Sequence, residues 1–313
     1  MTVDNKFKDL LLNVSTQAAL SSYYLVGKKD KIAADKAAVD SMRNELNKID
    51  MKGRIVIGEG ELDEAPMLFI GEELGTKNGP ELDIAVDPLE GTNFAANNLP
   101  GALSVIAIAE KNNLFNAPET YMNKIAISDS QKGIVDLDYT IEQNIKNLAE
   151  HKNKKPESLT ACILDRPRHR KIIQELMRLK VNLKLISDGD ISGALLVSQD
   201  NFDVDIFLGI GGGPEGVLAA CALDAFDCYF QGKFLFDTNE DKIRAKKMGI
   251  TNFQKKYELN EIISGDSIFC ATGITSGDLV KGIEINGNKF SSETLVTHKS
   301  SKLKKIFKIT QNI

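Results

Sequence analysis

Strand-like and helix-like patterns alternate regularly over residues 140–223, and this alternation constrains the fold more than any other feature of the chain. Short apolar runs typical of buried strands are separated by longer runs typical of helices. Such alternation favours parallel pairing of the strands, with helices on the faces of the sheet. The expected elements are helices at 140–150, 168–179, 190–198 and 214–223, and strands at 159–164, 183–186 and 204–208.

The part of the chain before residue 140 predicts a mixed α/β region. The first 45 residues have a helical pattern, since Ala34, Ala38 and Met42 recur at four-residue spacing. The other elements expected before residue 140 are a helix at 65–74 and strands at 55–57, 84–86 and 103–108. Near the end of the chain, a hairpin turn is expected at 285–288 and a strand at 302–309. The polar segment 152–156 is the expected boundary between two lobes, 1–155 and 156–313.

Composition excludes several classes of partner. The chain has 313 residues, of which 42% are hydrophobic, so it can bury a large core. The net charge is −5 and the basic residues are scattered, whereas a nucleic-acid surface needs clustered positive charge. No apolar run approaches the roughly 20 residues that span a bilayer, and the polar start lacks a secretion signal. We therefore expect a cytoplasmic protein with a small-molecule partner.

The four cysteines predict no metal or redox site. They are far apart or lie in apolar stretches, and no two of them form a C-x-x-C pair. We expect reduced thiols in the core at Cys162, Cys221, Cys228 and Cys270.

An acidic turn follows the expected strand at 84–86. Asp87 ends the apolar run and Pro88 is expected to stop the strand, because proline has no backbone donor. Glu90, Gly91 and Thr92 then follow in a tight turn. Two carboxylates and a hydroxyl brought together in this way suit Mg²⁺ or Mn²⁺. The alternative is an ordinary acidic turn after a strand.

A second acidic turn follows the strand at 55–57. Glycines flank Glu59, so the backbone can approach a ligand closely. Four carboxylates lie within residues 59–64 and need either a cation or open water. Asp35 comes one position after Ala34 in the apolar stripe, so it is either a further ligand or an exposed helix residue.

The glycine-rich segment 209–216 joins an expected strand to an expected helix. It contains G-x-G-x-x-G, which is the dinucleotide-binding pattern in its usual context. However, Glu215 in the first helical turn would repel a pyrophosphate, and Pro214 removes a backbone donor there. The alternative is a site in which Glu215 binds a metal and glycine amides hold a phosphate or sugar oxygen.

These residues together resemble the class II fructose-1,6-bisphosphatases, within the lithium-sensitive phosphomonoesterase group. The resemblance covers nearly the whole chain, and the motifs in this order are specific to the class. Between Phe236 and Lys247 the chain is shorter than the family pattern, so no loop or subunit contact is inferred there. The matching elements are Lys31-x-x-Ala34-Asp35, residues 58–66, Asp87 to Thr92, Asn116-Ala117-Pro118 with Tyr121-Met122, Arg166 to His169, Asp188-Gly189-Asp190, Gly209 to Val217, Ala271 to Thr275 and Gly277-Asp278-Leu279.

The resemblance implies a two-lobed layered α/β sandwich in which the N-terminal lobe binds metal and the C-terminal lobe binds substrate. It also implies hydrolysis of the 1-phosphate of fructose 1,6-bisphosphate to fructose 6-phosphate, a reaction of gluconeogenesis, by a homo-oligomer that is a dimer or tetramer. Mn²⁺ or Mg²⁺ would activate water for direct attack. Thr92 would orient this water, Asp63 would assist and Lys31 would contact phosphate. The implied metal ligands are Asp35, Glu59, Asp87, Glu90 and Glu215.

The resemblance also implies how the substrate is held. Arg166 and Arg168, with Tyr121, would bind the phosphate that is not cleaved, although without the resemblance this pair would be interpreted as a surface pair. Asp188 and Asp190 would accept hydrogen bonds from sugar hydroxyls. His169 is interpreted as a packing residue rather than an acid. The full implied substrate set is Glu90, Gly91, Thr92, Tyr121, Arg166, Pro167, Arg168, Asp188, Gly189, Asp190 and, through its backbone, Gly212.

Three alternatives remain open from the sequence. The same chemistry could act on sedoheptulose 1,7-bisphosphate, inositol monophosphate or a 3′-phosphonucleotide. The glycine loop could serve an NAD-dependent oxidoreductase. The chain could also be a sugar-phosphate sensor without catalysis.

Overall fold

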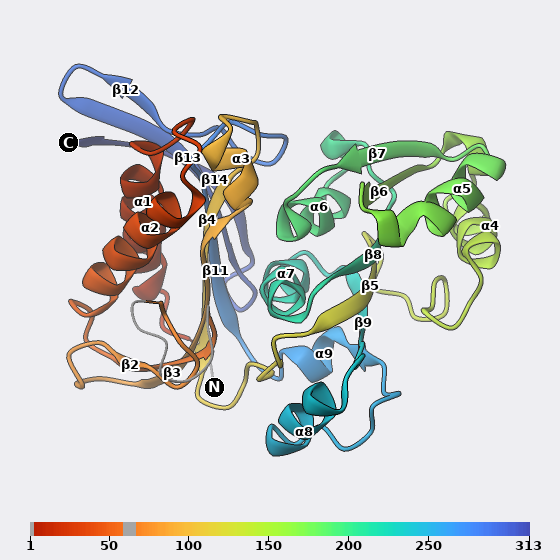
Figure 1. Cartoon of the computed structure of the whole chain (residues 1–313), viewed down its shortest axis with the longest axis horizontal. Coiled ribbons are helices and arrows are strands. Elements are labelled where there is room, and N and C mark those ends of the chain that lie inside the picture. The colour runs from red at the N-terminus through yellow and green to blue at the C-terminus, as the bar shows by residue number, and fades with distance from the viewer. Residues whose placement is uncertain (1–2, 59–66) are drawn as a thin grey trace. The chain divides into compact units, whose positions relative to one another are not determined.

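The computed structural model describes residues 3–58 and 67–313 (Figure 1). The chain forms two compact units: 1–116 together with 263–313, and 117–262. This division differs from the expected lobes 1–155 and 156–313. The reason is that β5 (Tyr121–Ile127) pairs within the second sheet, whereas β11 (Ser267–Gly273) returns to the first. No helix of the described ranges is both long enough and apolar enough to cross a membrane.

The sheet of the first unit is mixed. Its strands lie in the order β12-β13-β11-β4-β3-β1-β2, and β14 also pairs with β13. The pair β1 and β3 is parallel, and the other pairs are antiparallel. The strands not yet given are β1 (Lys52–Ile57), β2 (Glu73–Leu74), β3 (Glu81–Glu90), β4 (Leu103–Glu110), β12 (Glu284–Asn286), β13 (Lys289–His298) and β14 (Leu303–Asn312).

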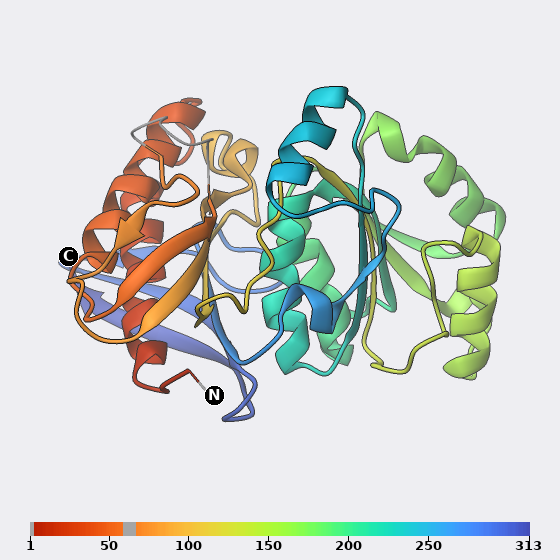
Figure 2. The same cartoon turned by 90° about the horizontal axis from the view of Figure 1, so that it is seen from below.

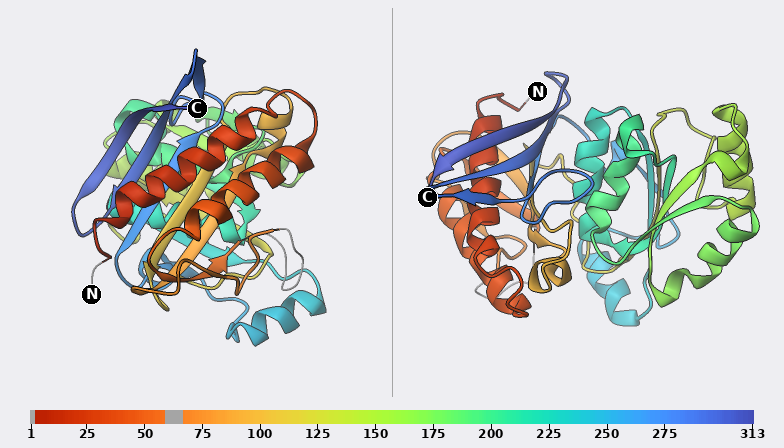
Figure 3. Two further views of the ribbon diagram at one scale, coloured as in Figure 1. Left: turned by 90° about the vertical axis from the view of Figure 1, so that its left-hand side faces the viewer. Right: turned by 90° about the horizontal axis from the view of Figure 1, so that it is seen from above.

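Two helices, α1 (Phe7–Tyr23) and α2 (Lys31–Leu46), cover one face of this sheet (Figure 3, left). The predicted stripe of Ala34, Ala38 and Met42 is fully buried against the sheet core. The helical pattern is interrupted between the two helices, and Asp30 begins α2 by accepting a hydrogen bond from Ala33 N at 2.9 Å. The short helix α3 (Thr92–Ala96) completes this unit.

One expected helix of the first unit is wrong. The prediction at 65–74 falls partly on residues outside the described ranges. Its described part, residues 67–74, forms turns and the short strand β2 rather than a helix. The Arg54 and Gly53 positions of β1 pair with β2 there, so tertiary pairing overrides the local pattern.

The second unit has the predicted alternation of strands and helices. Its sheet order is β10-β9-β5-β8-β6-β7, with β6 parallel to both β7 and β8, and β5 antiparallel to β8 and β9. The strands are β6 (Thr160–Leu164), β7 (Asn182–Ile186), β8 (Ile206–Gly212), β9 (Tyr229–Phe234) and β10 (Tyr257–Glu258). The helices are α4 (Ile141–His151), α5 (Arg170–Arg178), α6 (Asp190–Leu195), α7 (Gly213–Ala225), α8 (Asn239–Lys247) and α9 (Leu259–Ile262).

Helices cover both faces of the second sheet. Figures 1 and 2 show α6 and α7 on one face, and α4 and α5 on the other. Helix α7 is buried along most of its length, which agrees with its continuous apolar sequence. Each unit by itself is a sheet covered by helices, which agrees with the α/β class expected from the sequence.

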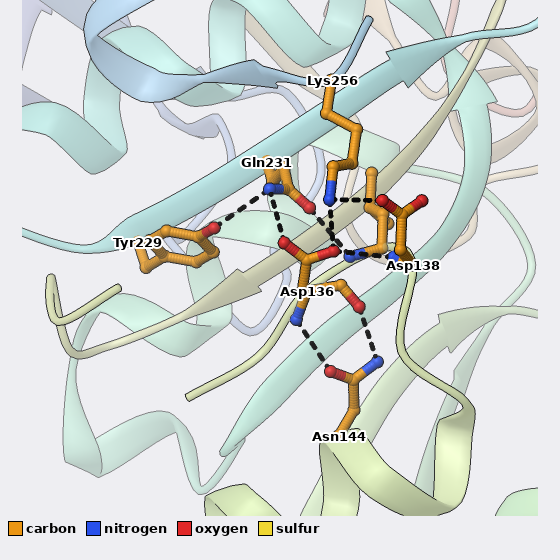
Figure 4. Close-up of polar contacts among 7 residues, drawn as sticks. Asp136, Asp138, Asn144, Tyr229, Gln231 and Lys256 are labelled. Atoms are coloured by element: carbon orange, nitrogen blue, oxygen red, sulfur yellow. Dashed lines mark hydrogen bonds and ion pairs between the residues drawn. The ribbon is translucent and has the colours of Figure 1, made fainter. Parts of the chain in front are cut away.

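A polar network fastens the segment between β5 and α4 to the second sheet (Figure 4). The Asp136 carboxylate binds Lys256 Nζ at 2.5 Å and accepts a hydrogen bond from Gln231 Nε2 at 3.2 Å. Gln231 also donates to the Tyr229 hydroxyl, and the Asp136 backbone exchanges two hydrogen bonds with the Asn144 side chain. Buried polar groups satisfied in this way hold an irregular segment in one conformation.

Candidate active site

The first part of the candidate site lies where β3 passes into α3. Strand β3 continues through Pro88 to Glu90, so the prediction that Pro88 stops the strand is wrong. Asp87 pairs with Val105 and Glu90 with Leu103, so one extra residue is accommodated between them as a bulge. A bulge tolerates proline and redirects the neighbouring side chains.

Gly91 then turns the chain into α3. Its φ of 77° is left-handed, and a Cβ at this position would lie 2.8 Å from Phe94 Cδ2. Glu90 is buried, while Asp87 and Thr92 are half-buried. The two carboxylates and the hydroxyl of the predicted acidic turn therefore lie within one strand-to-helix corner.

Helix α2 brings Asp35 to the same unit of the protein. This helix packs against β3 and α3, and Asp35 is half-buried on it, at the edge of the stripe as predicted. Lys31 is exposed at the first position of α2. Glu59 and Asp63 lie outside the described residues. Within the described ranges, no three histidine, cysteine, aspartate or glutamate side chains are arranged to hold a metal ion.

A separate group of predicted residues is built on the parallel strands of the second unit. The carboxyl ends of parallel strands meet at one edge of a sheet, which is where α/β proteins bind their ligands. Arg166 and Arg168 follow β6, Asp188 and Asp190 follow β7, and Glu215 follows β8. Arg166 Nη2 lies 3.4 Å from Asp188 Oδ1. The sheet edge thus collects Arg166, Arg168, Asp188 and Asp190, whereas Glu90, Gly91 and Thr92 of the predicted substrate set lie at the β3–α3 corner of the first unit.

Arg168 is held in place by two contacts. Its Nε donates a hydrogen bond to Ile210 O at 2.8 Å, and its guanidinium carbon lies 4.8 Å from the centre of the Tyr121 ring. Pro167 starts the 3₁₀ turn that carries Arg168, since its fixed φ suits the first position of a helical turn. A stacked guanidinium with an anchored Nε presents its terminal nitrogens in a fixed direction.

His169 is fully buried beside these arginines. Its Nδ1 lies 2.6 Å from Leu164 O, and its Nε2 accepts a hydrogen bond from Ile210 N at 2.7 Å. Burial lowers the pKa of His169, and the neighbouring Arg168 charge contributes to the same direction. Both ring nitrogens are engaged with backbone, which agrees with a packing residue and not with an acid.

Lys124 is a residue of this site that the sequence analysis missed. It lies on β5 with 1% of its surface exposed, and its Nζ donates to the Asp190 carboxylate and to Gly212 O at 2.6 Å. The signal available in the sequence was a lysine inside the otherwise apolar run Lys124-Ile125-Ala126-Ile127. Such a lysine must find a buried partner, but the sequence does not say which one.

The glycines of the 209–216 loop make room for carboxylates. A Cβ at Gly211 would lie 2.2 Å from Asp190 Oδ2, and a Cβ at Gly212 would lie 1.8 Å from Glu215 Oε2. Glu215 stands in the first turn of α7, where the helix dipole favours negative charge. Gly212 also contributes its carbonyl to Lys124, so the close approach that these glycines allow serves side chains of the protein itself.

The comparison with known proteins decides the family. Residues 6–311 match the family described as "Bacterial fructose-1,6-bisphosphatase, glpX-encoded". This chain belongs to that family. The match confirms the resemblance inferred from the motifs.

Cyanobacterial relatives agree with this assignment. A protein of Synechococcus sp. (strain JA-2-3B'a(2-13)) is 40% identical, over 96% of this chain and 94% of the relative. One of Thermosynechococcus vestitus (strain NIES-2133 / IAM M-273 / BP-1) is 41% identical over the same shares, and one of Prochlorococcus marinus (strain MIT 9515) is 42% identical over 91% and 90%. All three are named D-fructose 1,6-bisphosphatase class 2/sedoheptulose 1,7-bisphosphatase.

Membership of a phosphatase family confirms the main functional prediction and gives no support to the oxidoreductase alternative.

The glycine loop is better suited to binding a cation than to binding a dinucleotide. Burial raises the pKa of Glu215, and the Lys124 ammonium opposes that rise. Glu215 Oε2 is buried and accepts no hydrogen bond within the described part of the chain. A buried carboxylate oxygen of this kind is a suitable ligand for a hard divalent cation.

Proposed function

We propose that this protein hydrolyses the 1-phosphate of fructose 1,6-bisphosphate, giving fructose 6-phosphate and phosphate, with Mn²⁺ or Mg²⁺ as cofactor. The observation that carries the proposal is the sheet edge of the second unit, where two arginines and two aspartates gather in a member of this phosphatase family. Paired arginines suit a phosphate that stays on the product, and carboxylates suit sugar hydroxyls.

The divalent ions would be held by Asp35, Glu59, Asp87, Glu90 and Glu215. Hard oxygen donors of this type prefer Mg²⁺ or Mn²⁺. When bound, such ions supply positive charge at the reacting phosphate and make hydroxide available near neutral pH. The buried Glu215 oxygen supports this part of the proposal.

The protein's own groups would orient the reaction. The Thr92 hydroxyl would align the attacking water, Asp63 would assist as a base or as a further metal contact, and Lys31 would contact the phosphate. Water aligned for direct attack leaves no covalent intermediate on the enzyme. Glu90 and Gly91 would complete the pocket around the 1-phosphate.

The sugar and its other phosphate would be bound by residues at the ends of β5, β6 and β7. Arg166 and Arg168 would bind the 6-phosphate, and Tyr121 would support Arg168 by the stacking contact already described. Asp188 and Asp190 would accept hydrogen bonds from the sugar hydroxyls, with Pro167, Gly189 and Gly212 shaping the backbone around them. Because this phosphate does not react, its binding affects KM more than kcat.

Sedoheptulose 1,7-bisphosphate is the second candidate substrate, because the relatives' names combine the two activities. It is also a bisphosphorylated ketose, so it would use the same arginine anchor. A role in gluconeogenesis, a cytoplasmic location and assembly as a dimer or tetramer stay predictions.

Phosphate release from a panel of substrates tests the proposal. The panel contains both bisphosphates, fructose 6-phosphate, inositol 1-phosphate and a 3′-phosphonucleotide, each with EDTA, Mg²⁺ or Mn²⁺. We expect metal-dependent release from fructose 1,6-bisphosphate with the highest kcat/KM. Preference for inositol 1-phosphate or the nucleotide would contradict the assignment, and binding of sugar bisphosphate without release would indicate a sensor.

A further inference from the structure

The most unusual side chain in the second unit is Lys124, whose ammonium is buried inside a β-sheet. Its stem runs along Gly216, where a Cβ would lie 3.2 Å from Lys124 Cδ. The ammonium binds Asp190 and the carbonyl of Gly212. Removing an ammonium from water is costly, so a lysine placed this deeply needs compensating ionic and hydrogen-bond partners.

The partner of Lys124 is only partly used by it. Asp190 is 8% exposed, and one of its carboxylate oxygens binds Lys124. The other oxygen is buried and accepts no hydrogen bond from the residues that the structure describes. Buried carboxylate oxygens are nearly always hydrogen-bonded, so an oxygen left in this state is suited to receive a donor from a ligand.

A second buried ion pair in the same unit provides the contrast. Asp205 is 4% exposed, and its Oδ1 binds Lys152 at 2.8 Å and Lys154 at 3.0 Å. Its Oδ2 accepts a hydrogen bond from Thr160 N at 2.9 Å. Both oxygens of Asp205 are thus satisfied by the protein, as expected of a structural pair. The Lys124 pair differs from it by one buried carboxylate oxygen that has no hydrogen-bond partner among the described residues.

The second contact of Lys124 reaches the turn that carries Glu215. Gly212 is the last residue of β8, and Glu215 follows in the first turn of α7. The ammonium therefore holds the carbonyl at the start of this turn while it holds Asp190 from the side. The Lys124 ammonium thus binds both Asp190 and Gly212, which are 22 positions apart in the sequence.

We propose that Lys124 is a positioning residue for substrate binding. It holds one oxygen of Asp190 so that the other accepts a hydroxyl of the sugar, and it fixes the β8–α7 turn through Gly212. The proposal rests on the proposed function, because it takes the sugar phosphate as the ligand.

A double-mutant cycle tests the link between Lys124 and Asp190. Lys124→Met keeps the length of the side chain and removes its charge, and Asp190→Asn removes the partner charge. The wild type, both single variants and the double variant are compared by KM and kcat for fructose 1,6-bisphosphate, by fructose 6-phosphate Kd from calorimetry with Mn²⁺, and by Tm. Lys124→Gln, which retains a donor, replaces Lys124→Met if the latter is not recovered folded.

We expect each single variant to raise KM and the product Kd by about tenfold or more, with a smaller change in kcat. The double variant should bind no worse than Asp190→Asn alone, because residues that act through one another are not additive. Lys152→Met is the matched control, since it breaks the saturated ion pair with Asp205. It should lower Tm and leave KM and the product Kd unchanged.

Two outcomes would overturn the inference. Either the effects of Lys124→Met and Asp190→Asn multiply in the double variant, or Lys124→Met lowers Tm without changing KM and Kd, as the control does. A wild-type protein that releases no phosphate from either sugar bisphosphate contradicts the proposed function instead. The kinetics of the wild type therefore separate failure of the function from failure of the role of Lys124.

Discussion

The backbone N–H of Ile210 donates a hydrogen bond to Nε2 of His169 at 2.7 Å. Because Nε2 is the acceptor, the proton of the neutral ring is on Nδ1, which donates to Leu164 O at 2.6 Å. The ring thus joins the end of β6 to β8. These strands lead to Arg168 and to Glu215, so a buried histidine sets the spacing of two parts of the candidate site.

The first prediction concerns His169 and pH. Burial lowers its pKa in the folded protein below the unfolded value of about 6.5, so the unfolded state binds more protons in mildly acidic solution. Its contribution to stability is therefore complete above about pH 6.5 and is lost as pH falls through the folded pKa. We expect wild-type unfolding free energy to decrease from about pH 6.5 downward, and His169→Phe to show a weaker decrease.

Urea unfolding at a series of pH values measures this effect. At pH 8, His169→Phe should be less stable by about 1–3 kcal/mol, because Leu164 O and Ile210 N lose their partner. If the unfolding free energies of the wild type and the variant fall in parallel as pH decreases, His169 does not cause the acid sensitivity.

Most of the second unit follows from local sequence. The alternation over 140–223 predicted its strands and helices close to their observed positions, because each element carries its own periodicity and ends at glycine, proline or a polar residue. The glycine loop was also placed correctly between a strand and a helix. The sequence predicts either a dinucleotide loop or a metal site at Glu215 there, but not the packing of Gly211 against Asp190, because Asp190 lies on another connection.

Features that depend on distant partners were missed. Residues 73–74 form a strand because β1 pairs with them, and β3 continues through Pro88 because a bulge absorbs it. Lys124 and Asp190 are 66 positions apart, so no local pattern links them. The acidic turns stand out in the sequence because their carboxylates cluster near glycines, whereas one buried lysine is a single exception within a strand. The metal ligands in those turns stay a prediction.

A second prediction separates binding from chemistry at the arginines. Arg168→Ala should raise KM for fructose 1,6-bisphosphate about tenfold or more, with little change in kcat, if it holds the phosphate that does not react. Arg168→Lys should raise KM almost as much, because lysine lacks the planar guanidinium that Ile210 O and the Tyr121 ring hold in place. Arg166→Ala is expected to behave like Arg168→Ala.

Kinetics on a monophosphate provide the comparison. Activity on inositol 1-phosphate, where it is measurable, should barely change in these variants. Arg178→Ala is a control, since Arg178 is an exposed arginine paired with Glu142 and Glu175. Equal losses on bisphosphate and monophosphate would contradict the anchor role.

The third prediction concerns metal dependence and Glu215. Dialysis against EDTA should abolish phosphate release, and Mn²⁺ or Mg²⁺ should restore it. Glu215→Gln keeps the shape of the side chain but removes its charge, so Mn²⁺ affinity measured by calorimetry should fall about tenfold or more. Glu175→Gln, at an exposed ion pair, should leave that affinity unchanged. Full activity in EDTA would exclude the metal mechanism.

The last prediction concerns Thr92, whose hydroxyl could serve catalysis and whose methyl group could serve packing. Thr92 is half-buried at the first position of α3, directly after the left-handed Gly91. If the hydroxyl orients the attacking water, Thr92→Ser should keep much of the activity, while Thr92→Val should lose about 10²-fold or more in kcat. The KM of Thr92→Val should change little if, as proposed, Thr92 aligns the water only in the transition state and Arg166 and Arg168 bind the sugar phosphate.

If Thr92 serves only the strand-to-helix turn, the order of the two variants reverses. Valine keeps the shape and the branched Cβ, so Thr92→Val would keep its activity. Thr92→Ser would lose the packing of one methyl group, which lowers Tm and not kcat. Measuring kcat, Mn²⁺ affinity and Tm for both variants therefore distinguishes the roles, and a fully active Thr92→Val enzyme would remove Thr92 from the mechanism.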